Sequence, residues 1–86
     1  MEVFKYTLAV ADYQIVVMPV GAQLLDAQMQ GNQLCLWALV NLANPAVQRT
    51  IAIHETGQEF AKGGTYVATF QTGPLVFHVF DHGEKT

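Results

Sequence analysis

A long stretch of this chain carries almost no charge. Between Tyr13 and Gln48 the only charged residue is Asp26, and the segment 63–80 contains no Lys, Arg, Asp or Glu. A folded chain of this length exposes roughly 5,000 Å² to water. The four Lys and Arg and seven Asp and Glu residues are too few to cover that surface. We therefore expect uncharged polar groups, or another copy of the chain, to cover part of it.

The length of the chain predicts a single domain over residues 1–86. A domain this small is marginally stable unless a further feature supports it. Cys35 is the only cysteine, so no disulfide can form within the chain, and no Cys and His residues have metal-ligand spacing. Oligomerisation is the remaining common route to stability. We therefore predict an obligate homo-oligomer, without a prediction of its subunit number.

Charge and hydropathy argue against nucleic-acid and membrane partners. The formal net charge is −3, and the few basic residues are scattered, whereas nucleic-acid binding needs clustered cations. The longest strictly apolar run, 34–40, has seven residues, and a membrane-spanning helix needs about twenty. The first residues, Met1-Glu2-Val3, do not resemble a signal peptide. We expect a protein of a reducing cytoplasm.

Alternation and turn signals predict an all-β fold, either a small antiparallel sandwich or a barrel of about six to seven strands. Pro19 should end its strand or lie at a sheet edge. Phe77 and Val79 should face the core, with His78 on the other face. The polar tail 82–86 is predicted to be flexible. Strands are expected at 2–9, 13–19, 23–30, 33–42, 48–55, 65–71 and 75–81. Both faces of 33–42 are apolar, so this strand should be central and covered on both sides.

The chain offers little catalytic chemistry. It contains no serine, and Cys35 lies between two leucines, where an inert buried thiol is expected. His78 and His82 would face the same way on a strand, but zinc needs a third ligand that the pattern does not supply. We predict no catalytic residues, no metal site and no cofactor.

An anion site is the best functional hypothesis that the residues themselves support. Arg49 is the only arginine, and its guanidinium can contact a phosphate or carboxylate with two donors. Nearby glycine-bearing loops can present backbone N–H groups. The predicted ligand-binding residues are Arg49, His54, Thr56, Gly57, Lys62, Gly63 and Gly64. The alternative is that Arg49 pairs with Glu55 or Asp26 and that the glycines form ordinary turns.

Several segments resemble a family of small bacteriophage proteins of unassigned function. They are Pro19-Val20-Gly21-Ala22, Leu36-Trp37-Ala38-Leu39-Val40, Thr56-Gly57, Tyr66 with Thr69-Phe70-Gln71, and Leu75-Val76-Phe77-His78-Val79-Phe80. The similarity extends over nearly the whole chain. Family members more often have Gly-Thr-Gly-His where this chain has Glu55-Thr56-Gly57-Gln58, a difference that argues against a catalytic or metal role for this loop.

The resemblance implies a viral accessory protein that acts in the cytoplasm of a bacterial host. We predict a non-enzymatic protein that counters bacterial defence. It would either oligomerise and sequester a nucleotide-like signal or bind a host defence protein. The alternative is a structural or interaction module of the virion or its assembly, with no ligand.

Overall fold

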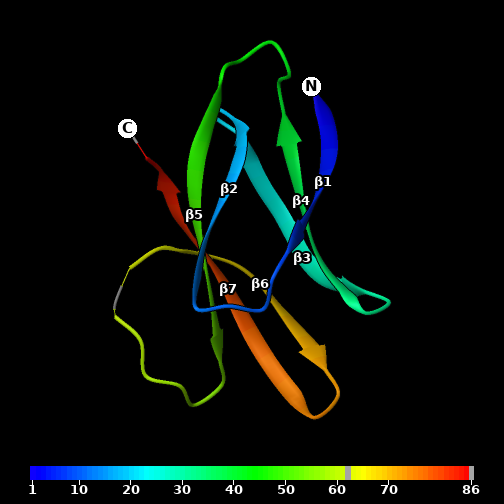
Figure 1. The fold of residues 1–86 in the computed structure, drawn as a ribbon, viewed down its shortest axis with the longest axis vertical. Coiled ribbons are helices and arrows are strands. Elements are labelled where there is room, and N and C mark those ends of the chain that lie inside the picture. Colours follow the sequence, from blue (N-terminus) through cyan, green and yellow to red (C-terminus); the bar gives the residue numbers. More distant parts are fainter. Residues whose placement is uncertain (62, 86) are drawn as a thin grey trace.

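The computed structural model describes residues 1–61 and 63–85 and shows an all-β protein (Figure 1). Its seven strands are β1 (Glu2–Leu8), β2 (Tyr13–Pro19), β3 (Gln23–Gln30), β4 (Gln33–Val40), β5 (Ala46–Glu55), β6 (Thr65–Thr72) and β7 (Leu75–Glu84). None of the described residues forms a helix long and apolar enough to cross a membrane.

The strands form two antiparallel sheets. One has the order β1-β4-β3 and the other β2-β5-β7-β6. The two sheets approach each other most closely where β3 lies beside β6, and there the Gln28 side-chain amide donates to the carbonyl oxygen of Thr69 over 3.2 Å. The predicted all-β class, the antiparallel pairing and the strand number are confirmed, and the exposed area of 5122 Å² agrees with the expected value.

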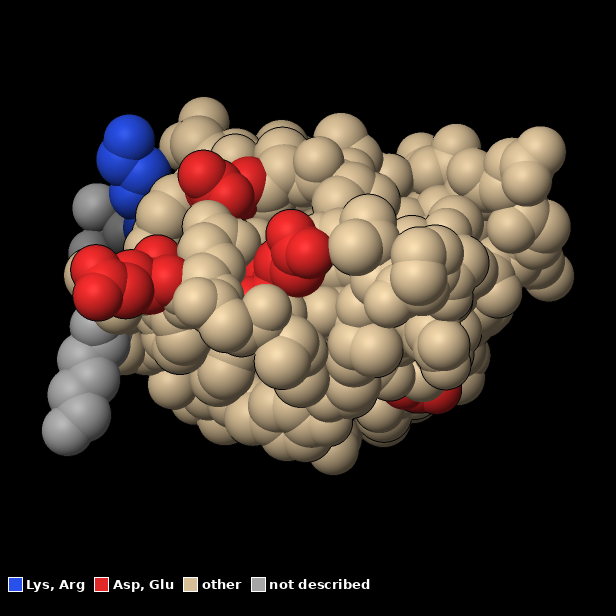
Figure 2. Space-filling model, turned by 90° about the horizontal axis from the view of Figure 1, so that it is seen from below, with Lys and Arg blue, Asp and Glu red and all other residues tan. Residues whose placement is uncertain are grey.

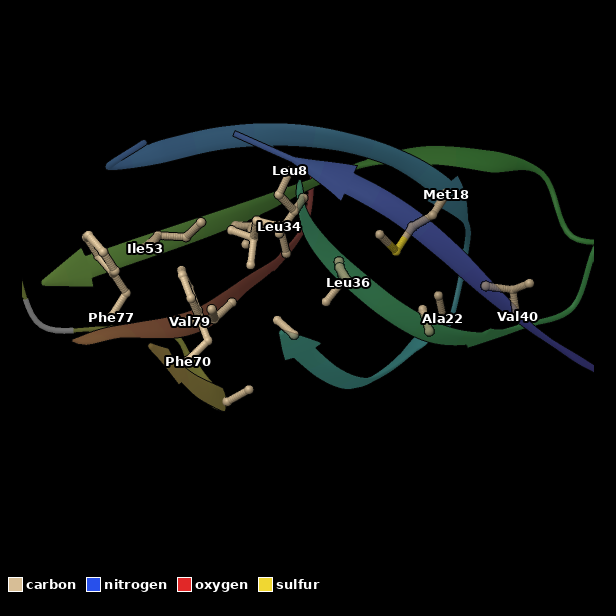
Figure 3. Close-up of a cluster of buried hydrophobic side chains, with 14 residues drawn as sticks. Leu8, Met18, Ala22, Leu34, Leu36, Val40, Ile53, Phe70, Phe77 and Val79 are labelled. Atoms are coloured by element: carbon tan, nitrogen blue, oxygen red, sulfur yellow. The ribbon is translucent and has the colours of Figure 1, made fainter. Parts of the chain in front are cut away.

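The core lies between the two sheets (Figure 3). Alternate residues of each strand point into it, because side chains alternate across a sheet. Phe77 and Val79 of β7 are buried there as predicted, and the ring of Phe77 stacks on Phe70 at 5.3 Å between centroids. The central strand β4 supplies Leu34, Leu36, Ala38 and Val40. The prediction that both faces of this strand are covered is confirmed only in part, because Cys35 on the opposite face is buried whereas Trp37 and Leu39 remain partly exposed.

The prediction of a flexible tail from His82 is wrong for residues 82–84, which continue β7. Two contacts hold this end of the chain. The Gly21 N–H donates to Glu84 Oε2 over 2.7 Å, and the Lys85 N–H donates to the Gln48 carbonyl over 2.8 Å. These partners lie far away in the sequence, so the polar composition of the tail gave no sign of them.

Candidate binding surface

The guanidinium of Arg49 is hydrogen-bonded within the fold and is not free to bind a ligand. Its Nε and one terminal nitrogen donate to both Asp81 carboxylate oxygens, over 3.1 and 2.6 Å. The other terminal nitrogen donates to the Ala22 carbonyl over 2.5 Å and lies 3.9 Å from Glu84 Oε2. The Arg49 and Asp81 side chains are only 12% and 14% exposed. This bidentate pair therefore joins β5, β7 and the connection between β2 and β3.

The pair shifts the pKa of both partners. The hydrogen bond from Arg49 to Asp81 raises the pKa of Arg49 against the opposing effect of burial. Burial alone would raise the pKa of Asp81, but hydrogen bonds from Arg49 and from the Gly83 N–H, with the positive charge of Arg49, lower it overall. The guanidinium is thus matched by a carboxylate of the same chain. This arrangement argues against the predicted anion contact at Arg49, and the alternative partners Glu55 and Asp26 are replaced by Asp81.

The other described residues of the predicted site make no hydrogen bond or ion pair with Arg49. Thr56 and Gly57 follow the far end of β5, about 20 Å along the strand from Arg49. Gly63 and Gly64 lie against His82, and a Cβ on Gly64 would stand 3.0 Å from His82 Nε2. Lys62 lies outside the described residues. The hydrogen bonds and ion pairs of Arg49 therefore include none of the other described residues of the predicted site.

Thr56 belongs to a chain of hydrogen bonds that passes through His78. Thr56 Oγ1 lies 2.8 Å from His78 Nε2, Thr69 Oγ1 lies 3.0 Å from His78 Nδ1, and the Tyr66 hydroxyl lies 2.8 Å from Thr69 Oγ1. The Thr56 hydroxyl also donates to the Val76 carbonyl over 3.2 Å. Which atom donates between Thr56 and His78 depends on the tautomer of the histidine, and the two threonine hydroxyls hold the ring on both sides.

His54, also predicted to bind ligand, is instead buried beneath the β5–β6 loop. It is 2% exposed, and neither ring nitrogen has a hydrogen-bond partner among residues 1–61 and 63–85. Phe60 stacks on it with centroids 4.0 Å apart and planes 13° apart. The edge of Tyr13 contacts it at 5.8 Å, and Phe80 lies at 6.0 Å. A small ligand could reach the His54 ring only if Phe60 moved.

These rings form one band across the outer face of the four-stranded sheet. Phe80 contacts both Phe60 and Tyr66, and Tyr13 contacts His82 at 5.5 Å. We call this the aromatic band, with the members Tyr13, His54, Phe60, Tyr66, Phe80 and His82. Tyr13, Phe60 and Tyr66 expose about half of their surface to solvent.

The aromatic band continues into exposed aliphatic residues along β2. Ile15 and Val17 follow Tyr13 at alternate positions of the strand and are 54% and 57% exposed. The face of the molecule seen in Figure 2 is covered mostly by uncharged residues, and most of the Asp and Glu residues visible there lie toward one end. Beside the band, residues 58–61 line a shallow, open depression of about 580 Å³.

The described residues contain no group of three or more His, Cys, Asp and Glu that could hold a metal.

Tyr13, Phe60, Tyr66 and Phe80 were not among the site residues predicted from the sequence. The sequence did contain a signal for an exposed aromatic face. Tyr13, Tyr66 and Phe80 lie on strands whose residues alternate between two faces, and the other face of each strand is apolar. What was missing was the register. Tyr13 pairs with Ala52, and Ala52 with Phe80, which in turn pairs with Tyr66. Only this non-local pairing brings the rings together.

Comparison with known proteins gives a family but no activity. No curated protein and no solved structure matches the chain. A family described as "Domain of unknown function (DUF7352)" matches residues 1–86, and the chain therefore belongs to this family.

Proposed function

We propose that this protein is a non-enzymatic bacteriophage accessory protein that counters bacterial defence by binding a host defence protein in the host cytoplasm. The phage context comes from the sequence resemblance. The observation that supports binding is the aromatic band, which continues into exposed Ile15 and Val17. Exposed apolar surface of this kind marks protein-interaction sites, and aromatic residues are enriched at such interfaces.

A protein partner fits this surface better than a nucleotide-like signal. A phosphate-bearing ligand needs cations or free backbone donors. Arg49 already has its guanidinium paired with Asp81 and Ala22, and none of the aromatic-band residues is Lys or Arg. The band instead offers ring faces and edges to an apolar partner surface. Sequestration of a signal is therefore the second form of the proposal.

The hydrogen-bond arrangement supports a binding role over catalysis. The described partners of the His78 ring nitrogens are two threonine hydroxyls, and neither partner is a carboxylate. In the described part of the chain, His54 has no hydrogen-bond partner that would orient it as a general base. Among the described residues, neither histidine has a carboxylate hydrogen-bonded to its ring, the group that commonly orients a catalytic base.

The test measures phage plating on a panel of bacterial strains, each of which carries one defence system. Expression of the wild-type protein should restore plating on at least one strain. Tyr66→Asp places a charge in the aromatic band and should abolish the effect, because a charge buried in an interface is costly. Val3→Asp is the matched control, since Val3 and Tyr66 are both 57% exposed and Val3 lies on the other sheet.

Two results would contradict the proposal. One is a Tyr66→Asp variant that folds and still restores plating as the wild type does. The other is calorimetric binding of a cyclic dinucleotide or an ADP-ribose-like compound by wild type and Tyr66→Asp alike, which would favour sequestration. Stoichiometric recovery of the protein in purified virions, with no effect on plating, would favour the structural alternative.

A further inference from the structure

Strand β2 is an edge strand without the usual protection against pairing. It pairs with β5 on one side, and on its other side it has no partner strand within the described chain (Figure 1). Natural edges are blocked by charges, bulges or covering elements. Edge strand β1 carries Glu2 and Lys5, β3 carries Asp26 and a bulge, and β6 has a bulge and lies beside β3. The residues of β2 carry no charge, and its pairing has no bulge.

The backbone of β2 presents free hydrogen-bonding groups at three positions. The Asp12 carbonyl accepts from the Ile53 N–H, and the Val20 N–H donates to the Pro45 carbonyl. Even-numbered residues therefore point their backbone groups toward β5. Because these directions alternate along a strand, Tyr13, Ile15 and Val17 point theirs away from it. Pro19 follows in the same series, where it has no N–H to offer.

We infer that two copies of this chain pair their β2 strands antiparallel about a two-fold axis at Ile15. Tyr13 then lies opposite Val17 of the second copy, and Ile15 lies opposite its own equivalent. Each of these pairs exchanges two N–H···O=C bonds, as antiparallel hydrogen-bonded pairs do. Pro19 falls outside the paired segment, so its missing N–H costs nothing.

A second copy suits this edge because the strand complements itself. The pairing gives two aromatic–aliphatic contacts and one Ile–Ile contact on the outer face, and such pairs stabilise sheets. No like charges meet at the axis, since the segment 13–25 is uncharged. A two-fold dimer is also the commonest form of homo-oligomer, because one surface serves both subunits.

The paired edges join the two four-stranded sheets into one continuous sheet. The aromatic bands of the two copies then lie on the same face, connected through Tyr13, Ile15 and Val17. The dimer rests on the edge geometry and not on the proposed host partner. Tyr66 lies on β6, at the opposite edge of the sheet, so a change there should leave the dimer intact.

The experiment combines sedimentation velocity over a concentration series with amide hydrogen exchange. Wild type should sediment as a dimer. In the dimer the amide protons of Tyr13, Ile15 and Val17 should exchange at least about tenfold more slowly than in the diluted monomer. The alternate amides, which already bond to β5, should change less. This odd-numbered pattern is specific to pairing at the free edge.

Ile15→Lys should dissociate the dimer, because it places two positive charges at the axis. Val3→Lys is the matched control, because Val3 is a β-branched residue of similar exposure (57% against 54%) on edge strand β1, and this variant should remain dimeric. A wild-type monomer at all concentrations would overturn the inference, as would an Ile15→Lys dimer. An oligomer in which those three amides exchange at monomer rates would also overturn it, and that measurement needs no folded variant.

Discussion

Asp81→Asn should destabilise the fold by removing the charge that matches Arg49. Asparagine has nearly the same size as aspartate, but one of its two oxygen acceptors is replaced by an NH2 donor. In the wild type a terminal nitrogen of Arg49 donates to Asp81 Oδ2 over 2.6 Å, and in the variant two donors would face each other there. Breaking a fully buried pair costs about 3–5 kcal/mol. Here the two side chains keep 12% and 14% exposure and Glu84 remains 3.9 Å away, so we expect about 2–3 kcal/mol.

Chemical and thermal unfolding followed by circular dichroism measure this loss. In a domain of this size, 2–3 kcal/mol corresponds to a fall in melting temperature of about 10–20 °C. Arg49→Ala should also lower it, because the partner of the buried Asp81 carboxylate is lost. The matched control is Asp26→Asn, because Asp26 lies on the other sheet and has no cationic partner among the described residues. A melting temperature equal to that of wild type for Asp81→Asn would refute the structural role of the pair.

The same pair makes a definite pH prediction. The folded-state pKa of Asp81 lies below its ordinary value of 3.8. Its stabilisation is therefore fully present above that value and is lost as the pH falls through the lowered folded-state pKa. The stability difference between wild type and Asp81→Asn should be constant near neutral pH and should shrink below about pH 4. A difference that stays the same in acid would contradict this assignment.

Two further changes test the packing. Phe77→Ala should cost about 3–5 kcal/mol in urea unfolding, because the ring is buried against Phe70; a cost below about 1 kcal/mol would contradict its core position. Gly64→Ala should destabilise more than Gly57→Ala. Both have a positive φ, 81° and 88°, which costs about 1–2 kcal/mol for alanine, but only at Gly64 would the new Cβ meet neighbouring atoms, those of His82 and the Asp81 carbonyl. Equal melting temperatures for the two variants would show that this contact is absent.

The strands could be predicted from sequence because their signals are local. Alternation over 23–30 and the Gly31-Asn32 turn, for example, match β3 and the start of β4. The end of β7 could not be predicted in this way. His82, Gly83 and Glu84 form a polar run, and they are held by Gly21 and Arg49 from distant parts of the chain. Strand order depends on the same long-range pairing, which no local pattern contains.

The candidate site was predicted less well than the fold, for a related reason. Arg49 has the cationic side chain of an anion-binding residue, and none of the residues near it in the sequence indicated a carboxylate that would pair with it. Its partner Asp81 is 32 positions away and reaches it only because β5 pairs with β7. His54 was selected for its chemistry and proved to be buried beneath Phe60. A residue's type indicates what it can do, but the pairing of the strands decides what it contacts.

The Arg49–Asp81 ion pair also reduces the small number of charged side chains that are left to cover the surface. Arg49 is one of four Lys and Arg residues, and it is used with Asp81 inside the fold, where neither helps to keep the surface soluble. On the outer face of the four-stranded sheet, the exposed rings of the aromatic band and the aliphatic side chains of Ile15 and Val17 face the solvent. Such a surface gains free energy when it is covered, at about 25 cal/mol for each Å² of apolar area removed from water. Both proposed contacts, β2 with a second copy and the aromatic band with a host protein, draw on this gain.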